Sequence, residues 1–496
     1  MRFTLGIDVS TTASKALVAD EEGQIAGVAS TPHSHSSPNP LWSEQEPAEW
    51  WQAATCSIRH VLDQSDVAPD AITAVGLTGQ MHGLVLLAAN GRVLRPAMLW
   101  NDGRSSVQCE AMRTRLGLDQ LVAITGNDAF TGFTAPKLLW VRDHEPEVYA
   151  QAEQVLLPKD YVRYRLTGEF ATDKAGAGGT LLLDLASRDW SDAVLDAIDI
   201  PRQWLPPTFE GSAVTGYITQ AAAIETGLRV GTPVVAGGGD QAAQAVGVGA
   251  VSPAIWALTL GTSGVVFAPC ATPRIAPQGR AHAFPHAVPG QWHMMGVMLS
   301  AAGSLRWYHD TLAAEMTYEG LLEEAARVPI GCEGLFFLPY LTGERTPHAN
   351  PLAQGAFVGL RPRHTRGHIT RAVLEGVAFG LRDNFLLLQE SGLSRPRELR
   401  ISGGGAQSPL WRQILSDVLE VELWTVQTQE GASFGAALCA GVGAGLWPTL
   451  EAACQQTIQT LPAARPDAAA SAQYEAAHAR FRSLYPSLRS FFGTSV

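Results

Sequence analysis

The chain has 496 residues, of which 46% are hydrophobic and 17% charged, and its formal net charge is -12. A chain of this length exceeds what one hydrophobic core usually organises, so two domains are expected. Lysine and arginine are scattered along this acidic chain, which argues against nucleic acid or an anionic membrane as partner and favours a small solute.

Cysteine usage and the start of the chain indicate a soluble protein of the cytoplasm. Asp8 precedes any apolar run of the kind a signal peptide needs, and the apolar stretch at 436–447 is too short and glycine-rich to span a bilayer. The six cysteines form no Cys-x-x-Cys or Cys/His pattern, which predicts reduced, buried thiols. They are Cys56, Cys109, Cys270, Cys332, Cys439 and Cys454.

Strands and helices alternate from the N-terminus. Short apolar segments at 3–8, 13–20 and 24–30 predict three strands joined by turns. Residues 47–64 begin with proline and have apolar residues at helical spacing, and 71–79 returns to a strand pattern. This order predicts an α/β fold with mixed sheets flanked by helices.

The opening pattern occurs a second time, half a chain later. Residues 254–269 again read as a strand, a turn rich in glycine and hydroxyl groups, and a strand, as residues 3–19 do. We therefore expect two related lobes with a cleft between them, divided into residues 1–245 and 246–496.

The second half carries longer amphipathic helices. They are predicted at 364–390 and 409–420. The stretch 461–473, rich in alanine and proline, is interpreted as a loosely packed connector before a last helix.

The two repeated hairpin turns combine backbone amides with hydroxyl groups, which can bind phosphate oxygens. Each turn taken alone is more often an ordinary turn, because glycine, serine and threonine are common turn residues. Their occurrence at equivalent places in two halves is more informative. The chain contains no GxxxxGK[ST] loop. The residues concerned are Ser10, Thr11 and Thr12 in the first turn, and Gly261, Thr262 and Ser263 in the second.

A third glycine turn lies between a strand and a helix. The apolar run 399–401 leads into Gly403 to Gly405, Ser408 can cap the following helix, and Pro409 suits its first turn. Bare backbone there would admit a flat ring or a phosphate, although an ordinary strand-to-helix turn explains the same pattern.

The segment "GGGDQAAQ" at 237–244 places Asp240 directly after three glycines. Taken locally, Asp240 is better explained as a helix cap than as a catalytic residue. It would also stand at the edge of a sheet, where the second half begins.

Together the three turns resemble the phosphate and adenosine segments of the superfamily of sugar kinases, hexokinase, actin and the Hsp70 ATPase domain. Residues 132–144 and 355–375 resemble the two signature patterns of the FGGY carbohydrate kinases. Other segments are similar to the members of that family that phosphorylate xylulose. These are 41–47, 76–87, 99–104, 156–173 and 338–351.

The resemblance implies two ribonuclease H-like lobes, ATP and Mg²⁺ as cofactors, and a sugar as acceptor. It implies that Asp240 is the general base that takes the proton of a sugar hydroxyl, and that Asp8 is the metal partner. It also implies that the three turns bind the nucleotide, through Ser10, Thr11, Thr12, Gly261, Thr262, Ser263, Gly404, Gly405 and Ala406.

The same resemblance implies a sugar pocket. Met81 would pack on the carbon face of the ketose, while His82 and Gln241 would hydrogen-bond to it together with Asp240. Whether residues 101–104 line this pocket or cap a helix start stays open. The residues concerned are Asn101, Asp102 and Arg104. Lys137 and Trp140 are interpreted as structural.

The expected activity is ATP-dependent phosphorylation of D-xylulose to D-xylulose 5-phosphate. Two residues depart from the pattern: Ser10 stands where the family usually has glycine, and Gln241 where xylulose-specific members commonly have asparagine. A kinase for another polyol or ketose, such as ribulose or glycerol, is therefore an alternative. A non-enzymatic ATP-dependent switch protein is a further one. A homodimer is possible on family grounds.

Overall fold

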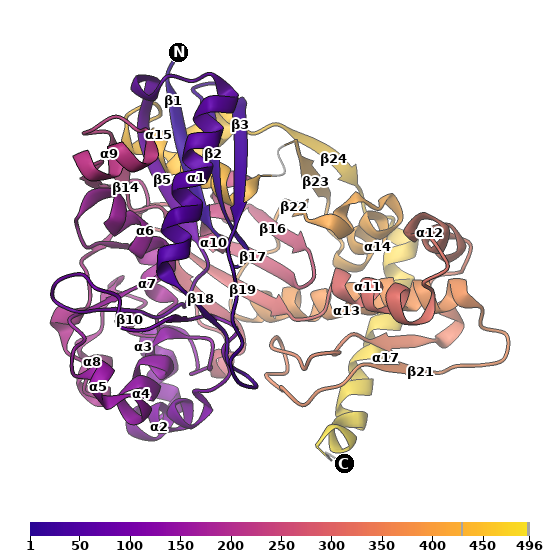
Figure 1. Ribbon diagram of the computed structural model, residues 1–496. Coiled ribbons are helices and arrows are strands. Elements are labelled where there is room, and N and C mark those ends of the chain that lie inside the picture. The colour runs from indigo at the N-terminus through magenta and orange to yellow at the C-terminus, as the bar shows by residue number, and fades with distance from the viewer. Residues whose placement is uncertain (428–429, 494–496) are drawn as a thin grey trace.

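The computed structural model of the protein describes residues 1–427 and 430–493. The chain forms two lobes, each built on a seven-stranded sheet flanked by helices (Figure 1). Among the described residues, no helix combines the length and the apolar character that crossing a membrane requires. All six cysteines are free thiols, and five of them are buried.

The first sheet has the order β13-β14-β5-β1-β2-β3, with β15 beside the end of β5. β1 pairs antiparallel with β2 and parallel with β5, so the sheet is mixed, as predicted. Its strands are β1 (Phe3–Val9), β2 (Ala13–Asp20), β3 (Ile25–Pro32), β5 (Ile72–Gly79), β13 (Val214–Tyr217), β14 (Pro233–Val235) and β15 (Gly238–Gly239).

The second sheet has the order β18-β19-β17-β16-β22-β23-β24. β16 pairs antiparallel with β17 and parallel with β22, which repeats the relation of β1 to β2 and β5. The predicted duplication is therefore present in the structure. The strands are β16 (Ile255–Leu260), β17 (Gly264–Cys270), β18 (His282–Pro285), β19 (Trp292–Met298), β22 (Glu398–Ser402), β23 (Leu423–Val426) and β24 (Thr460–Ala464).

Helices α1 (Pro47–Ser65) and α15 (Gly431–Gly443) pack against the first sheet. α15 follows the second sheet in the chain, yet it lies on β1 and β5 and beside α10 (Asp240–Gly247). This contact needs bare backbone, because a Cβ atom on Gly6 would come within 1.9 Å of the Ser433 carbonyl oxygen. A helix from the second half of the chain thus covers the first sheet; the proposed division at residue 245 stays a prediction.

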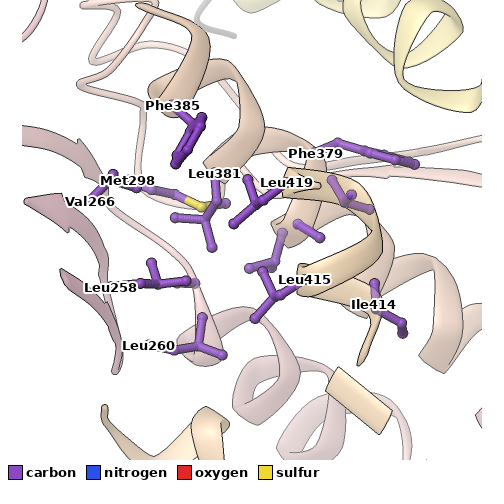
Figure 2. Close-up of a cluster of buried hydrophobic side chains, with 14 of the residues drawn as sticks. Leu258, Leu260, Val266, Met298, Phe379, Leu381, Phe385, Ile414, Leu415 and Leu419 are labelled. Atoms are coloured by element: carbon purple, nitrogen blue, oxygen red, sulfur yellow. The ribbon is translucent and has the colours of Figure 1, made fainter. Parts of the chain in front are cut away.

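The second lobe has its core between its sheet and helices α13 (Arg366–Glu390) and α14 (Pro409–Leu419). Figure 2 shows leucines of β16 facing Leu381 and Phe385 of α13 and Leu415 of α14. Helices α11 (Ala302–Leu312), α12 (Tyr318–Ala326) and α17 (Ala468–Phe492) contribute side chains to the same cluster.

A helical region inserted after β5 forms another core, which also includes Phe267 and Val297 of the second sheet. This cluster therefore contains residues of both halves of the chain. The helices of the region are α2 (Ser106–Leu116), α3 (Leu118–Thr125), α4 (Thr134–His144), α5 (Pro146–Tyr149), α6 (Pro158–Thr167), α7 (Lys174–Gly178) and α8 (Asp192–Ile198).

The interpretation of 461–473 as a loose connector is wrong. Residues Thr460–Ala464 form β24, which pairs antiparallel with β23 at the edge of the second sheet, and α17 begins at Ala468. Pro462 is tolerated because β24 is an edge strand. Asp467 caps α17 by accepting a hydrogen bond from the amide of Ala470.

Candidate functional site

Two carboxyl groups meet at one edge of the first sheet. Asp8 of β1 lies opposite Thr78 of β5, and Thr78 lies opposite Gly238 of β15, one position before the end of that strand. Asp240 follows as the first residue of α10, after Gly239, which is the N-cap. Its Oδ1 accepts a hydrogen bond from the amide of Gln241 at 2.7 Å.

The glycines before Asp240 allow two close contacts. Gly237 has a φ of 78°, and a Cβ atom there would come within 1.7 Å of the Leu77 carbonyl oxygen. A Cβ atom on Gly239 would come within 2.7 Å of Cγ of Met81. The bare backbone therefore lets the strand pass β5 closely and lets Met81 occupy the space beside Asp240.

Asp240 lines a cavity of about 180 Å³ that contains side chains of both lobes. Its polar lining residues are His82, Asp240, Gln241, Ser263, His282 and Arg345. Its apolar walls include Met81, Trp100, Phe130, Phe133, Val265, Met295 and Val297. A few polar side chains within apolar walls suit a polyol, because its hydroxyl groups need polar partners and its carbon face needs apolar ones.

The electrostatics of the site favour a proton-accepting carboxylate. Burial, with the nearby Asp8 charge as second cause, raises the pKa of Asp240 to about 7. Burial also raises the pKa of Asp8 to about 6, although the Lys15 ammonium opposes this effect. Lys15 also forms an ion pair with Glu430, whose charge opposes the effect of Lys15 on Asp8. The Asp8 Oδ1 is buried and has no hydrogen-bond partner in the described chain.

His82 lines the same cavity as a neutral imidazole in a defined tautomer. Its Nδ1 lies 2.6 Å from the carbonyl oxygen of Gly179, which only accepts, so Nδ1 carries the proton and Nε2 is an acceptor. Burial lowers the pKa of His82 to about 3, so the ring is neutral. Its φ of 68° is rare outside glycine. Lys137 supports this loop by donating to the His82 carbonyl oxygen at 2.9 Å.

The second and third glycine turns face a larger cavity of about 750 Å³. Gly261, Thr262, Gly404 and Gly405 line it, whereas Ser263 lines the smaller cavity. The hairpin turn of the second sheet thus separates the two spaces. Ala406 is buried and is not among the described residues that line either cavity. As predicted, Ser408 caps α14, accepting a hydrogen bond from the amide of Trp411.

The first turn lies close to the smaller cavity. Thr11 Oγ1 accepts a hydrogen bond from the indole of Trp100 at 3.0 Å, and Trp100 lines the cavity. Ser10 Oγ donates to the carbonyl oxygen of Ala13 at 2.8 Å, closing the turn with a side chain where the family usually has glycine. Thr12 is exposed.

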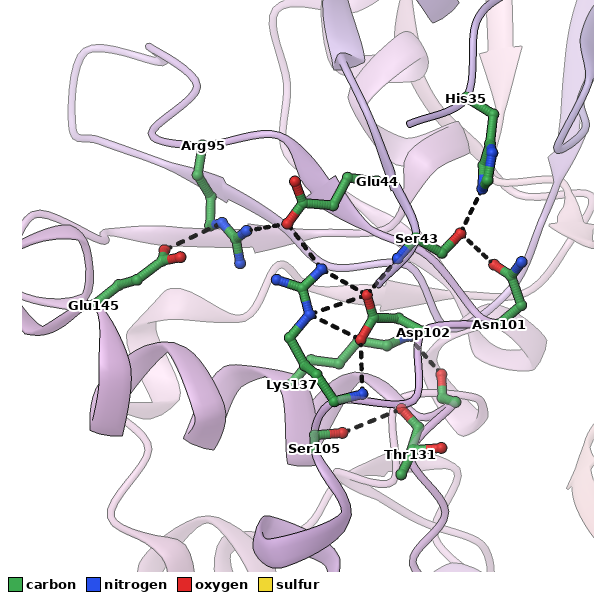
Figure 3. A network of polar contacts seen from close by, with 12 residues as sticks. His35, Ser43, Glu44, Arg95, Asn101, Asp102, Ser105, Thr131, Lys137 and Glu145 are labelled. Carbon is green, nitrogen blue, oxygen red and sulfur yellow. Dashed lines mark hydrogen bonds and ion pairs between the residues drawn. The ribbon is translucent and has the colours of Figure 1, made fainter. Parts of the chain in front are cut away.

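Asn101, Asp102 and Arg104 are not among the described residues that line the smaller cavity. Figure 3 shows Asp102 within a polar network, and Arg104 forms ion pairs with Asp102 at 2.6 Å and with Glu44 at 2.8 Å. Asn101 accepts a hydrogen bond from Ser43. The geometry gives these residues a structural place, because buried charges need partners.

Sequence reasoning missed several cavity residues. His282 begins β18, Arg345 follows β20 (Phe336–Leu338) in a loop, and Phe133 precedes α4. Arg345 belongs to a segment that carried the family resemblance, yet no local pattern shows that it faces Asp240. Only the approach of the two lobes brings these side chains together.

The N-terminal domain model of the FGGY family of carbohydrate kinases matches residues 3–247, and its C-terminal domain model matches residues 256–444. The chain therefore belongs to the FGGY family of carbohydrate kinases. It is an enzyme of the sugar phosphotransferase class, with the mixed α/β lobes of the actin and hexokinase superfamily.

Three relatives illustrate the similarity. The chain is 43% identical over 491 residues to "Xylulose kinase" of Escherichia coli K12, covering 98% of this chain and 99% of that protein. It is 30% identical to the "L-xylulose/3-keto-L-gulonate kinase" of the same organism, covering 99% and 98%. The crystal structure of ligand-bound xylulose kinase from Lactobacillus acidophilus superposes with a TM-score of 0.95 at 27% identity, covering 99% of both chains.

Proposed function

We propose that the protein transfers the γ-phosphoryl group of ATP to O5 of D-xylulose, giving D-xylulose 5-phosphate and ADP. The observation that carries this proposal is the small cavity in which Asp240 lies beside Met81, His82 and the Ser263 turn. The similarity to xylulose kinases over nearly the whole chain supports the choice of sugar.

In this reaction Asp240 acts as the general base. Its carboxylate accepts the O5 proton as O5 attacks the γ-phosphorus, and the bond to the β,γ-bridging oxygen breaks to release ADP. A pKa near 7 is well matched to this role at neutral pH. General-base assistance contributes about 10² to 10⁴ in rate, so the positioning of the two substrates supplies most of the remainder.

Asp8 fits a magnesium site. Its buried Oδ1 lacks a partner within the described chain, and Mg²⁺ is commonly held by one or two carboxylates together with waters and substrate phosphates. When bound, Mg²⁺ would neutralise phosphate charge during transfer.

The nucleotide is proposed to occupy the 750 Å³ cavity, with its phosphates directed toward the hairpin turn at Gly261 and Thr262. The glycines at 404 and 405 leave room for a flat ring at the far side. In this arrangement Ser263 stands between the γ-phosphate and the sugar, because it belongs to the same turn but lines the smaller cavity.

A second candidate is a kinase for a related sugar. Gln241 lines the cavity beside Asp240, and its side chain is one methylene longer than the asparagine common in xylulose-specific members. The relative that is named for L-xylulose and 3-keto-L-gulonate shows that related chains of this length act on other sugars.

The test is ADP release with D-xylulose, L-xylulose, D-ribulose, 3-keto-L-gulonate and glycerol, each with Mg-ATP. We expect the highest kcat/KM with D-xylulose, and loss of kcat by 10² or more in Asp240→Asn while Mg-ATP still binds. Preference for another sugar would identify the second candidate. Normal turnover of Asp240→Asn would reject Asp240 as the base.

A further inference from the structure

Arg345 stands in the smaller cavity without an acidic partner. It lines the cavity with Asp240, yet its guanidinium forms no ion pair among the described residues. The carboxyl group of Glu344 instead accepts hydrogen bonds from the backbone amides of Leu299 and Arg345, at 3.1 and 2.8 Å. Arg345 is half-buried, and its guanidinium therefore offers hydrogen-bond donors to an oxygen acceptor that enters the cavity.

Two histidine rings of the cavity present acceptors to complement this donor. The Nε2 of His82 is an acceptor, as its contact with Gly179 requires. His282 Nδ1 lies 2.9 Å from Oδ1 of Asn127, whose amide group donates to the carbonyl oxygens of Thr125 and Ala283. Oδ1 therefore faces His282 and takes its proton, which leaves His282 Nε2 as an acceptor too. That atom is buried and lacks a partner in the described chain.

The positive charge of Arg345 acts on both rings. Burial is the main cause of the lowered pKa of His82 and of His282, the Arg345 charge adds to both shifts, and all three side chains line one cavity. A guanidinium has only donors, and a neutral imidazole nitrogen without hydrogen only accepts. A hydroxyl group satisfies both kinds of neighbour at once, because its oxygen accepts and its hydrogen donates.

The loop that carries Arg345 is held in place before any ligand binds. Thr346 Oγ1 donates to the carbonyl oxygen of Arg280 at 3.2 Å and accepts from the amide of Val297 at 3.2 Å. The His348 ring stacks on Tyr485 of α17, with centroids 3.5 Å apart. The C-terminal helix, which lies beyond the matched family domains, thus fixes this loop.

We infer that Arg345 binds an oxygen atom of the sugar from the side of the second lobe, and that this contact helps to determine which sugars the cavity accepts. The inference rests on the proposed function, because it takes the cavity around Asp240 as the sugar site. Arg345 donates to the sugar oxygen, and the hydrogen of that hydroxyl group points to a histidine acceptor. The sugar is then held between His82 of the first lobe and Arg345 of the second.

The test compares Arg345→Gln and Arg345→Lys with the parent enzyme. We expect the KM for D-xylulose to rise about 10- to 100-fold in Arg345→Gln, the fold-change expected when a charged hydrogen bond is lost. The kcat should stay within about threefold and the KM for ATP should not change, since the contact forms in the ground state. Arg345→Lys keeps the positive charge but loses the two-pronged donor geometry of the guanidinium, so its KM for D-xylulose should lie between those of the parent and Arg345→Gln.

Arg361→Gln is the matched control, because Arg361 is an exposed arginine of the same lobe and does not line the cavity. The kcat of Arg361→Gln and its KM values for D-xylulose and ATP should equal those of the parent. Thermal denaturation identifies any variant that fails to fold, and Arg345→Lys then carries the comparison.

Deoxy analogues of the sugar supply a second readout that a merely structural role would not affect. The penalty of Arg345→Gln should vanish for the one analogue that lacks the contacted oxygen and persist for the others. An unchanged KM, a fall in kcat at constant KM, or an equal penalty for every analogue would overturn the inference. Failure of the proposed function is seen separately, as parent enzyme that does not phosphorylate D-xylulose.

Discussion

The carboxyl groups of Asp8 and Asp240 lie at one edge of the first sheet; burial raises the pKa of both, and the Asp8 charge makes ionisation of Asp240 still more costly. A protein chosen for stability alone would not place two unpaired acids there. Because the raised pKa is a property of the folded state, it links the stability of the protein to pH.

Asp240→Asn should stabilise the ligand-free protein, and more so at high pH. The pKa of Asp240 is raised from 3.8 to about 7, so its protonated form favours folding at low pH, and this contribution is lost as pH rises through 7. Between pH 5 and pH 8 the advantage of the variant over the parent should grow by about 2–3 kcal/mol. Urea denaturation of both proteins at pH 5 and pH 8, without Mg²⁺, measures this difference in the free energy of unfolding.

Asp20→Asn is a suitable comparison, because Asp20 ends β2 in the same lobe and accepts two backbone hydrogen bonds. That change should not become more favourable as pH rises. A difference between Asp240→Asn and the parent that does not vary with pH would mean that Asp240 is not a buried acid.

Single residues differ in how well the sequence reveals them. Asp240 could be predicted because glycines and an alanine-rich helix surround it, and the reason for the glycines proved to be packing against β5 and Met81. The ion pair of Arg104 with Glu44 could not be predicted, because Glu44 is distant in sequence. His282 and Arg345 were missed for the same reason.

At the scale of elements, the contact between α10 and α15 joins helices from the two halves of the chain on the first lobe. The two helices approach so closely that a Cβ atom on Gly435 would come within 1.9 Å of the Ala243 carbonyl oxygen. On the other side of α15, glycines of β1 and β5 allow similar approach. Asp240 is the first residue of α10, so this packing also positions the proposed base.

Gly435→Ala should destabilise the protein by about 1–3 kcal/mol, because backbone atoms that cannot rotate away would have to shift. It should also lower kcat by displacing α10. Thermal denaturation and steady-state rates measure both effects.

Gly320→Ala in α12 is the matched control. Its Cβ atom would meet the end of a flexible side chain, Met316, at 3.1 Å. Alanine is also the better helix former, so this change should be neutral or slightly stabilising. Equal effects of the two substitutions would show that the contact of α10 with α15 is not tightly packed.

Element types were easier to predict than their neighbours. The first strands and the helices at 364–390 and 409–420 were found within two residues of their observed ends, because their apolar spacing is regular. β24 was missed because proline and alanine favour a loop locally, and its pairing with β23 is a tertiary effect.

At the scale of the molecule, the two cavities differ in which lobe builds them. The larger cavity is lined by residues between 260 and 411 alone, all from the second half of the chain. The smaller one takes Met81 and His82 from the first half and Ser263 and Arg345 from the second. The cavity proposed for the nucleotide is therefore lined by one lobe, whereas the cavity proposed for the sugar is lined by both.

Sugar binding should draw the lobes together, whereas a nucleotide alone should not. We expect the radius of gyration from small-angle X-ray scattering to fall when D-xylulose is added with a non-hydrolysable ATP analogue, and to change little with the analogue alone. Closure would also exclude water as a competing acceptor. Equal scattering with and without sugar would argue against closure.

The duplication of the fold was predictable because the two hairpins share a pattern at equivalent places in each half. The place of α15 on the first sheet was not, since nothing in its local sequence says which sheet it covers.

That helix also sets the order in which the protein can be completed. At Gly6 and Gly76, the first sheet is covered by residues 431–443. A nascent chain must therefore leave the ribosome almost entirely before its earliest strands are shielded from water. The first strands to be synthesised therefore stay partly uncovered until α15, which is synthesised nearly last, packs on them.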